Sequence, residues 1–343
     1  MRPLLLALLL LVAAGAVLFV VSRFRAEEGA AFLPARERAE EAKIAPGRIA
    51  ASSSSTARGV RETDGVRHSV PLDEIRQGCP GRDCIPSVDD PVFVAAREAE
   101  SFLGEEDIGI GLVYKGEARF YPFSMLVTRE IVNDTVAGDP LLITYCPLCG
   151  TGIVFSRRVG GAVREFGVSG LLWQSNLLMY DRRPAPEESS LWSQVLGEAV
   201  LGPQTGTALT PIPSDVVRWA SWRAAHPATL VLNTGDTRDP YGGEYYGVAR
   251  AFAPDFDEAS SPLPPTAYVY GIEVNGSFKA YPKEAVQARG VISDEVGGEA
   301  IEVRAAKDGT VAVRTAQGEI IPDVEGFWFS WSAAHPETAL YAP

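Results

Sequence analysis

The sequence predicts a mainly β (α+β) fold: two pseudo-equivalent β-rich lobes from an internal duplication, with short peripheral helices, behind an N-terminal transmembrane helix. Three observations support this prediction. Short apolar runs separated by Gly-rich turns predominate in the folded region. Residues 111–140 recur in similar form at 271–300. The run from Pro3 to Val21 is apolar, uncharged and long enough to cross a bilayer.

Residues 1–22 are expected to form an uncleaved signal anchor, because no small-x-small cleavage site follows the apolar run. A cleaved signal peptide is the alternative. Residues 23–67 are then a flexible tether, which becomes low in complexity at Ser52–Thr56. We therefore expect a single-pass protein of the cell membrane that contacts the membrane through this helix and has an extracytoplasmic folded region. The net charge of −13 argues against nucleic acid as a partner.

The internal repeat defines two lobes, predicted at 68–265 and 266–343. Residues 111–140 and 271–300 align at an offset of 160 with eight identities, and the later segments 219–229 and 328–338 align at an offset of 109. The second lobe is therefore the shorter copy.

Within each copy we expect a β-hairpin, then a short helix, a second hairpin and a terminal helix. Lys115-Gly116 and Asn275-Gly276 mark the first hairpin turns. Asp134 and Asp294 are expected in turns. The Trp-x-x-Trp-x-x-x-His-Pro pattern places its aromatic residues on one face of a helix that Pro ends.

The most informative motif is Tyr145–Thr151, in which Cys146 and Cys149 lie between two apolar runs. This pattern predicts a strand, a tight turn and a strand, the knuckle geometry of soft-metal sites. A redox pair in which both cysteines are catalytic is the alternative, although such pairs usually open a helix. As a metal site the pair is incomplete, and Met179 could add a thioether to bind zinc, copper or iron. Only the first lobe carries these thiols.

The other two cysteines, Cys79 and Cys84, enclose a short turn-rich segment. In an oxidising compartment this spacing favours a local structural disulfide over metal ligation.

Several polar residues interrupt the strand-like apolar run that follows the thiols. They are candidates for a pocket beside the thiol pair, because buried polar side chains must find partners or line a wet cavity. Turn and edge positions are the alternative explanation. The candidates are Ser169, Ser175, Asn176, Asp181 and Arg182.

The chain resembles a prokaryotic family known as domain-of-unknown-function family 3179. The resemblance runs from Leu72 to Leu232 and rests on six stretches, which are 71–75, 131–135, Thr144-Tyr-Cys-Pro-Leu-Cys-Gly-Thr151, 166–170, 179–182 and 190–194. It implies no activity. Two departures stand out: Arg129 occupies a position where the family commonly has His, and Cys79 and Cys84 are a local addition.

Two functions remain open from the sequence. One is an extracytoplasmic protein with a thiol-redox or soft-metal site at Cys146 and Cys149. The other is a non-catalytic interaction or scaffold module in which that pair is a structural disulfide.

Overall fold

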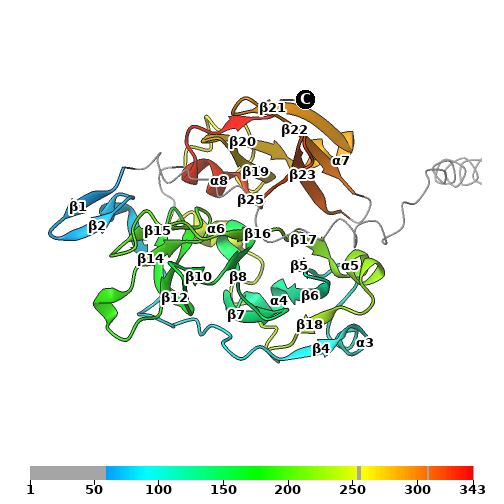
Figure 1. Ribbon diagram of the computed structural model, residues 1–343, viewed down its shortest axis with the longest axis horizontal. Helices are drawn as coiled ribbons and strands as arrows, with labels where there is room; N and C mark the ends of the chain where they lie inside the picture. Colours follow the sequence, from blue (N-terminus) through cyan, green and yellow to red (C-terminus); the bar gives the residue numbers. More distant parts are fainter. Residues whose placement is uncertain (1–58, 253–255, 307–308, 343) are drawn as a thin grey trace, which may run out of the picture. The chain divides into compact units, whose positions relative to one another are not determined.

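The computed structural model describes residues 59–252, 256–306 and 309–342. All of them belong to one compact unit that spans Ala42–Pro343. The expected anchor and residues 23–58 of the expected tether lie outside the described residues. Among the residues that are described, no helix is long and apolar enough to cross a membrane. The described chain is mainly β with short helices, as the sequence predicted (Figure 1).

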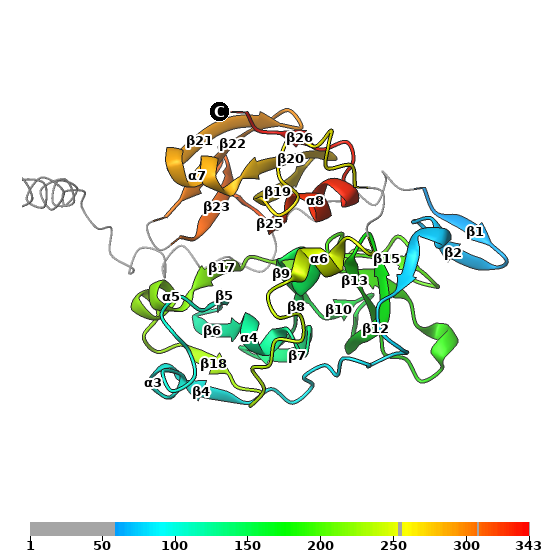
Figure 2. The same ribbon diagram turned by 180° about the vertical axis from the view of Figure 1, so that it is seen from behind.

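The largest sheet has seven antiparallel strands in the order β1-β2-β15-β14-β13-β12-β3. The strands β1 and β2 form a hairpin that projects from this sheet in both views (Figures 1 and 2). Asp64 and Gly65 both have positive φ at its turn, the geometry that a two-residue hairpin requires. This hairpin includes the last residues of the expected tether. The bounds are β1 Arg61–Thr63, β2 Val66–His68, β3 Ile75–Gln77, β12 Phe166–Trp173, β13 Asn176–Asp181, β14 Leu191–Ser193 and β15 Glu198–Leu201.

A four-stranded antiparallel sheet, in the order β16-β9-β8-β7, carries the Tyr145–Thr151 motif. Its strands are β7 Ile131–Val136, β8 Asp139–Cys146, β9 Thr151–Ser156 and β16 Pro211–Ile212, and a small hairpin of β10 Arg158–Val159 and β11 Ala162–Val163 follows β9. Asp134 lies within β7, and the turn is made by Ala137 and Gly138, both at positive φ. The expectation of a turn at Asp134 is therefore wrong: the Asp lies inside the strand, where its carboxylate accepts hydrogen bonds from Tyr121 and Arg119.

One arrangement of strands and a helix occurs twice. The sheet β17-β5-β6-β18-β4 contains β4 Phe93–Ala95, β5 Ile108–Tyr114, β6 Glu117–Pro122, β17 Asp215–Arg218 and β18 Leu230–Leu232. The sheet β25-β19-β20-β26 contains β19 Tyr268–Val274, β20 Ser277–Pro282, β25 Asp323–Phe327 and β26 Ala339–Leu340. In both sheets a central hairpin is flanked by one antiparallel strand and, on the other side, by one parallel strand.

The two Trp-containing helices pack in the same way on these sheets. They are α5 Trp219–Ala225 and α8 Trp328–Ala334. The indole of Trp222 donates to Thr229 at 3.0 Å, and the indole of Trp331 donates to Thr338 at 2.9 Å. A Cβ on Gly271 would come within 2.3 Å of the Trp331 ring. Glycine at this strand position is therefore what lets the helix approach the sheet.

The remaining elements complete the second half and connect the sheets. The antiparallel sheet β21-β22-β23-β24 consists of β21 Val291–Val296, β22 Glu299–Ala305, β23 Val311–Thr315 and β24 Ile320–Ile321. Asp294 lies in β21 and not in a turn, which corrects the expectation for this residue also. The other helices are short: η1 Leu72–Glu74, α3 Ala96–Ala99, α4 Phe123–Leu126, η2 Pro147–Cys149, η3 Pro186–Glu188, α6 Tyr245–Ala249 and α7 Lys283–Arg289.

Candidate functional site

The thiol motif has the strand, turn and strand geometry that the sequence predicted. Cys146 ends β8 and pairs with Thr151 of β9, and η2 makes the turn between them. Gly150 closes the turn with a φ of 62°. A Cβ on Gly150 would lie 3.1 Å from Phe327 and from the hydroxyl of Tyr268. Positive φ and crowding together explain why glycine stands here.

Both cysteines of the motif are free thiols in the protein interior. Cys146 is 1% exposed and Cys149 is fully buried. Each sulfhydryl lies within hydrogen-bonding distance of one carbonyl oxygen, that of Ser175, at 3.6 Å from Cys146 and 3.3 Å from Cys149. The alternative function from the sequence assumed a structural disulfide between Cys146 and Cys149. In the structure both are thiols, and both donate to the carbonyl of Ser175.

The acceptor belongs to a strained turn. Gln174 and Ser175 connect β12 to β13, and both residues adopt positive φ, at 50° and 63°. Such a conformation is uncommon for residues other than Gly, Asn and Asp. The hydroxyl of Ser175 donates to the carbonyl of Ala249 at 2.6 Å. The cysteine motif and helix α6 therefore hold this turn through the same residue.

Burial keeps the Cys146 thiol protonated. It raises the pKa of Cys146 well above its ordinary value, and the neighbouring Cys149 adds to that shift. Thiolate is the form that attacks substrates and binds metals, so this environment disfavours both. Among the described residues, no three His, Cys, Asp or Glu side chains are grouped so that they could hold a metal ion. Met179 lies in the same apolar cluster as the two thiols.

Beside the thiols lies a fully buried network of polar side chains centred on Gln194. Its carbonyl oxygen accepts from Thr151 at 2.8 Å and from Asn176 at 2.9 Å. Its amide nitrogen donates to the hydroxyl of Thr144 and the carbonyl of Thr151, both at 3.2 Å. The amide of Asn176 also approaches the sulfur of Cys149 at 3.7 Å. These groups satisfy one another, as buried polar groups must.

The five residues predicted to line a pocket lie in separate parts of the structure. Ser175 and Asn176 lie against the thiols. Ser169 lies at a bulge in β12, where it donates to the carbonyl of Leu178 at 2.5 Å. Asp181 accepts from the backbone of Ser190 at 2.7 Å and from the indole of Trp192 at 3.1 Å.

Arg182 belongs to a fourth place, a half-exposed ion-pair cluster. Its guanidinium bonds Asp89 at 2.6 Å, Ser87 at 2.8 Å and Asp83 at 3.2 Å. Although burial opposes the shift, the hydrogen bond from Arg182 contributes to lowering the pKa of Asp89. This cluster fixes the segment that carries the second disulfide cysteine.

Cys79 and Cys84 form the predicted disulfide. The loop that they close pairs with the bulged strand: Gly78 donates to the carbonyl of Gly170 at 2.8 Å, and Asp83 donates to Val168 at 2.7 Å. A Cβ on Gly170 would come within 2.5 Å of the backbone of Gly81. The disulfide loop therefore covers the bulge at close range.

Sequence reasoning missed Glu130 as a residue of this region. Its φ is 58°, and the amide of Ile131 donates to the carbonyl of Arg129 at 2.7 Å across it, a strained three-residue turn. The side chain is 6% exposed. Burial, then the neighbouring Cys146, raises the pKa of Glu130 well above the ordinary range. The sequence signal that could have identified Glu130 is its position immediately before Ile131, the start of a family stretch.

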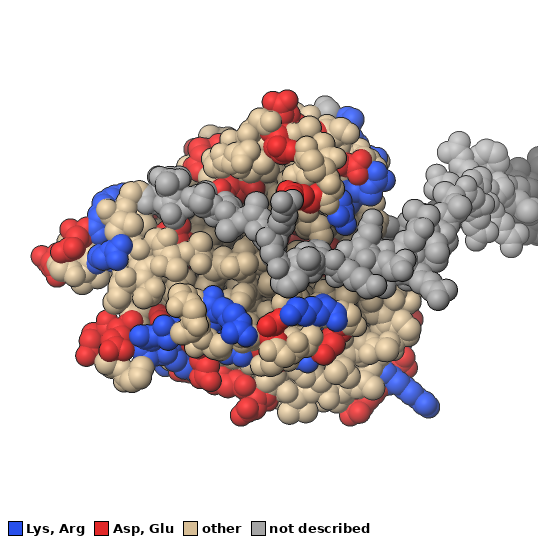
Figure 3. Space-filling view, viewed as in Figure 1, with Lys and Arg blue, Asp and Glu red and all other residues tan. Residues whose placement is uncertain are grey.

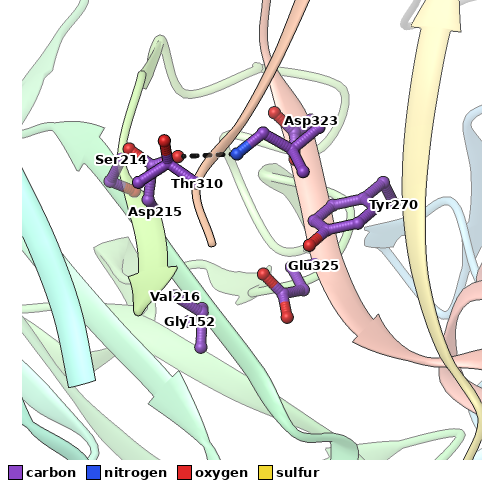
Figure 4. A pocket seen from close by; sticks show the side chains of 9 residues that line it. Gly152, Ser214, Asp215, Val216, Tyr270, Thr310, Asp323 and Glu325 are labelled. Carbon is purple, nitrogen blue, oxygen red and sulfur yellow. Dashed lines mark hydrogen bonds between the residues drawn. The ribbon is translucent and has the colours of Figure 1, made fainter. Parts of the chain in front are cut away.

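A second feature that was missed is an acidic cavity of about 10 Å³ (Figure 4). Its walls include Asp215 of β17, Asp323 and Glu325 of β25, and Tyr270 of β19. Strands β9 and β23 contribute Gly152 and Val311. This volume holds about one water molecule.

These observations define a mainly β protein built around a buried thiol pair, with a separate acidic cavity. The chain belongs to the family described as protein of unknown function, DUF3179, whose family model matches residues 82–319. The match continues beyond Leu232, where the expected resemblance ended. No curated protein matches the chain, and no solved structure does.

Proposed function

We propose that the folded region is a non-catalytic interaction module and that Cys146 and Cys149 serve it structurally, as paired donors to the Ser175 turn. The observation that carries this proposal is their geometry: both thiols are buried and both face one carbonyl oxygen. A redox or nucleophilic cysteine needs thiolate character and access, and this environment favours neither.

We further propose that the N-terminal segment 1–22 anchors the module and that residues 23–58 extend the tether, so that the module lies outside the cytoplasm. The disulfide between Cys79 and Cys84 supports an oxidising compartment. We also propose that the two lobes arose by duplication. The recurring strand order and the paired Trp-to-Thr hydrogen bonds support this origin.

We assign the partner contact to an open surface hollow of about 260 Å³. Its walls are mostly polar and include Asp90, Arg129, Asn233 and Thr234, beside Val88 and Val92. On the face in Figure 3, acidic and basic side chains are interspersed and form no broad patch of one sign. The hollow itself is lined by both acidic and basic side chains, Asp89, Asp90 and Arg129, so a polar partner of mixed charge fits it better than a strongly charged polymer.

The experiment is a comparison of the full chain with its Cys146→Ser/Cys149→Ser variant, using crosslinking in cells followed by identification of the attached proteins. We expect the variant to unfold at lower denaturant concentration and to keep the same partners. Arg129→Ala in the hollow is the converse control, expected to lose partners and keep stability. A Cys variant that stays folded but loses a partner or an activity would refute the structural role.

Glu130 favours a second candidate function, the thiol-redox or soft-metal site. A strained, buried acid beside Cys146 is the kind of feature that clusters at active sites. Metal analysis of the reduced protein after anaerobic loading with zinc, copper or iron tests it. Stoichiometric metal that disappears in the Cys variant would support this candidate over the first.

A further inference from the structure

The acidic cavity is formed by corresponding strands from the two halves of the chain. One half contributes β9 and β17, and the other contributes β23 and β25. Strands β17 and β25 each precede one of the two Trp-containing helices. The amide of Val311 donates to the carboxylate of Asp215 at 3.3 Å across this joint. Strand β25 also approaches β9 so closely that a Cβ on Gly326 would lie 2.3 Å from Thr151.

Negative charge exceeds positive charge around the cavity, most clearly near Asp323. The ammonium of Lys283 from α7 bonds Glu325 and neutralises that carboxylate. Asp323 and Asp215 are the other acids that face the space, one from each half. Among the described residues, β9 and β23 add no charged group to the cavity wall.

The hydroxyl of Tyr270 supplies a separate indication that the cavity binds something. Tyr270 is 2% exposed, and its ring projects towards the space between Asp323 and Glu325 (Figure 4). The hydroxyl is buried, and Gln287 approaches it as a hydrogen-bond partner without reaching full hydrogen-bond geometry. A buried hydroxyl that is so poorly satisfied is costly unless a bound species completes it.

We propose that the cavity is a proton-binding site, in which Asp323 holds a proton against Asp215 and so couples the joint between β17 and β25 to pH. A neutral carboxyl can donate to an acid across the cavity or to a water that Tyr270 also contacts. Two ionised carboxylates in so small a space would repel each other.

The electrostatics have the sign that the proposal requires. Asp323 is half-buried by surface area. Its desolvation, then the charges of Asp215 and Glu325, raises its pKa above the ordinary value of 3.8. Burial also raises the pKa of Glu325, against the opposing effect of Lys283. A carboxyl with a raised pKa in the folded state stabilises that state fully below its unfolded pKa. That contribution is lost as pH rises towards the folded value.

The test is denaturant unfolding of the full chain across a pH series, for the natural protein and Asp323→Asn. For the natural protein we expect the proton that Asp323 releases to raise the unfolding constant by up to about tenfold per pH unit above the ordinary Asp pKa. In D323N this contribution should be absent while those of Glu130 and Glu325 remain, so the variant should gain on the natural protein as pH increases. Identical pH profiles for the two proteins would overturn the proposal.

Asp294→Asn is the matched control. Asp294 pairs with Lys279 at 2.6 Å and Tyr281 at 2.8 Å, and despite partial burial these bonds lower its pKa. The stabilisation it provides is therefore lost on acidification, and D294N should change the acid side of the profile and leave the alkaline side unchanged.

Infrared spectroscopy of the folded full chain provides a measurement that does not depend on unfolding. We expect protonated-carboxyl C=O absorption that persists above pH 5 and shifts on deuteration. One band of it should be lost in D323N, whereas the absorption of the buried Glu130 should remain. If D323N does not fold, Asp215→Asn serves in its place: it removes the facing charge, so the band should titrate at lower pH. A natural protein with no such band above pH 5 would refute proton binding at this site.

Discussion

Replacing Gln194 by Ala should be among the most damaging single substitutions in the molecule. The side chain is fully buried, and it both accepts and donates hydrogen bonds within the network beside the thiols. Truncation removes the acceptor of two buried donors, the hydroxyl of Thr151 and the amide of Asn176. Each stranded donor costs about 1–3 kcal/mol, and the vacated space adds about 1 kcal/mol. We expect a loss of about 3–7 kcal/mol, a large part of a typical domain stability of about 5–15 kcal/mol.

Urea unfolding of the full chain, followed by intrinsic Trp fluorescence, measures this loss as a lower midpoint at an unchanged slope. Gln77→Ala is the matched control, because Gln77 is exposed on the edge strand β3, and it should change stability by less than about 0.5 kcal/mol. A Q194A variant within about 1 kcal/mol of the natural protein would show that the neighbours repair the network, and the reasoning from stranded donors would be wrong.

Three further predictions concern other parts of the chain. Alkylation of the native protein should leave the buried thiol pair unmodified, whereas alkylation in denaturant should label both cysteines. Peptide mapping distinguishes these results. Rapid labelling of the native protein would contradict the burial argument. Gly271→Ala should lower the unfolding free energy by about 1–3 kcal/mol, because its Cβ would lie 2.3 Å from the Trp331 ring; Gly59→Ala, with no atom within 4 Å of the added Cβ, should be neutral in the same thermal-unfolding assay. Deleting residues 1–25 should release a soluble fragment with an unchanged far-UV circular dichroism spectrum, and a fragment that still sediments with membranes would show a second attachment.

Local chemistry made part of this architecture predictable. Asn275-Gly276 forms the hairpin turn that its dipeptide favours, with positive φ at both residues. The spacing of Trp328 and Trp331 places both side chains in the core on one helix face. The cysteine motif formed the expected strand, turn and strand. In each case the residues that determine the local structure lie within a few positions of each other in the sequence.

The rest depends on contacts between distant segments. Gln194 gave no periodic signal, and its place in the family stretch 190–194 did not indicate its partners, yet it joins three strands through hydrogen bonds that span 18 to 50 residues. Asp215 and Asp323 face one cavity although 108 positions separate them in the sequence. The candidates Ser175 and Arg182 are close in sequence, but they lie at opposite ends of β13 and serve different clusters. Proximity in sequence does not determine which buried polar groups share an environment.

The position of β18 has a consequence for the order in which this chain can fold during synthesis. β18 lies between β6 and β4 in its sheet. When the ribosome has extended the β5–β6 hairpin, the outer edge of β6 has no neighbour until Leu230 has emerged more than 100 residues later. For that interval, β4 also lacks its partner. Unpaired strand edges attract other chains, so a pause in translation anywhere between β6 and β18 would prolong the state most prone to misassembly. A chaperone that binds extended strands would have its best opportunity in the same interval.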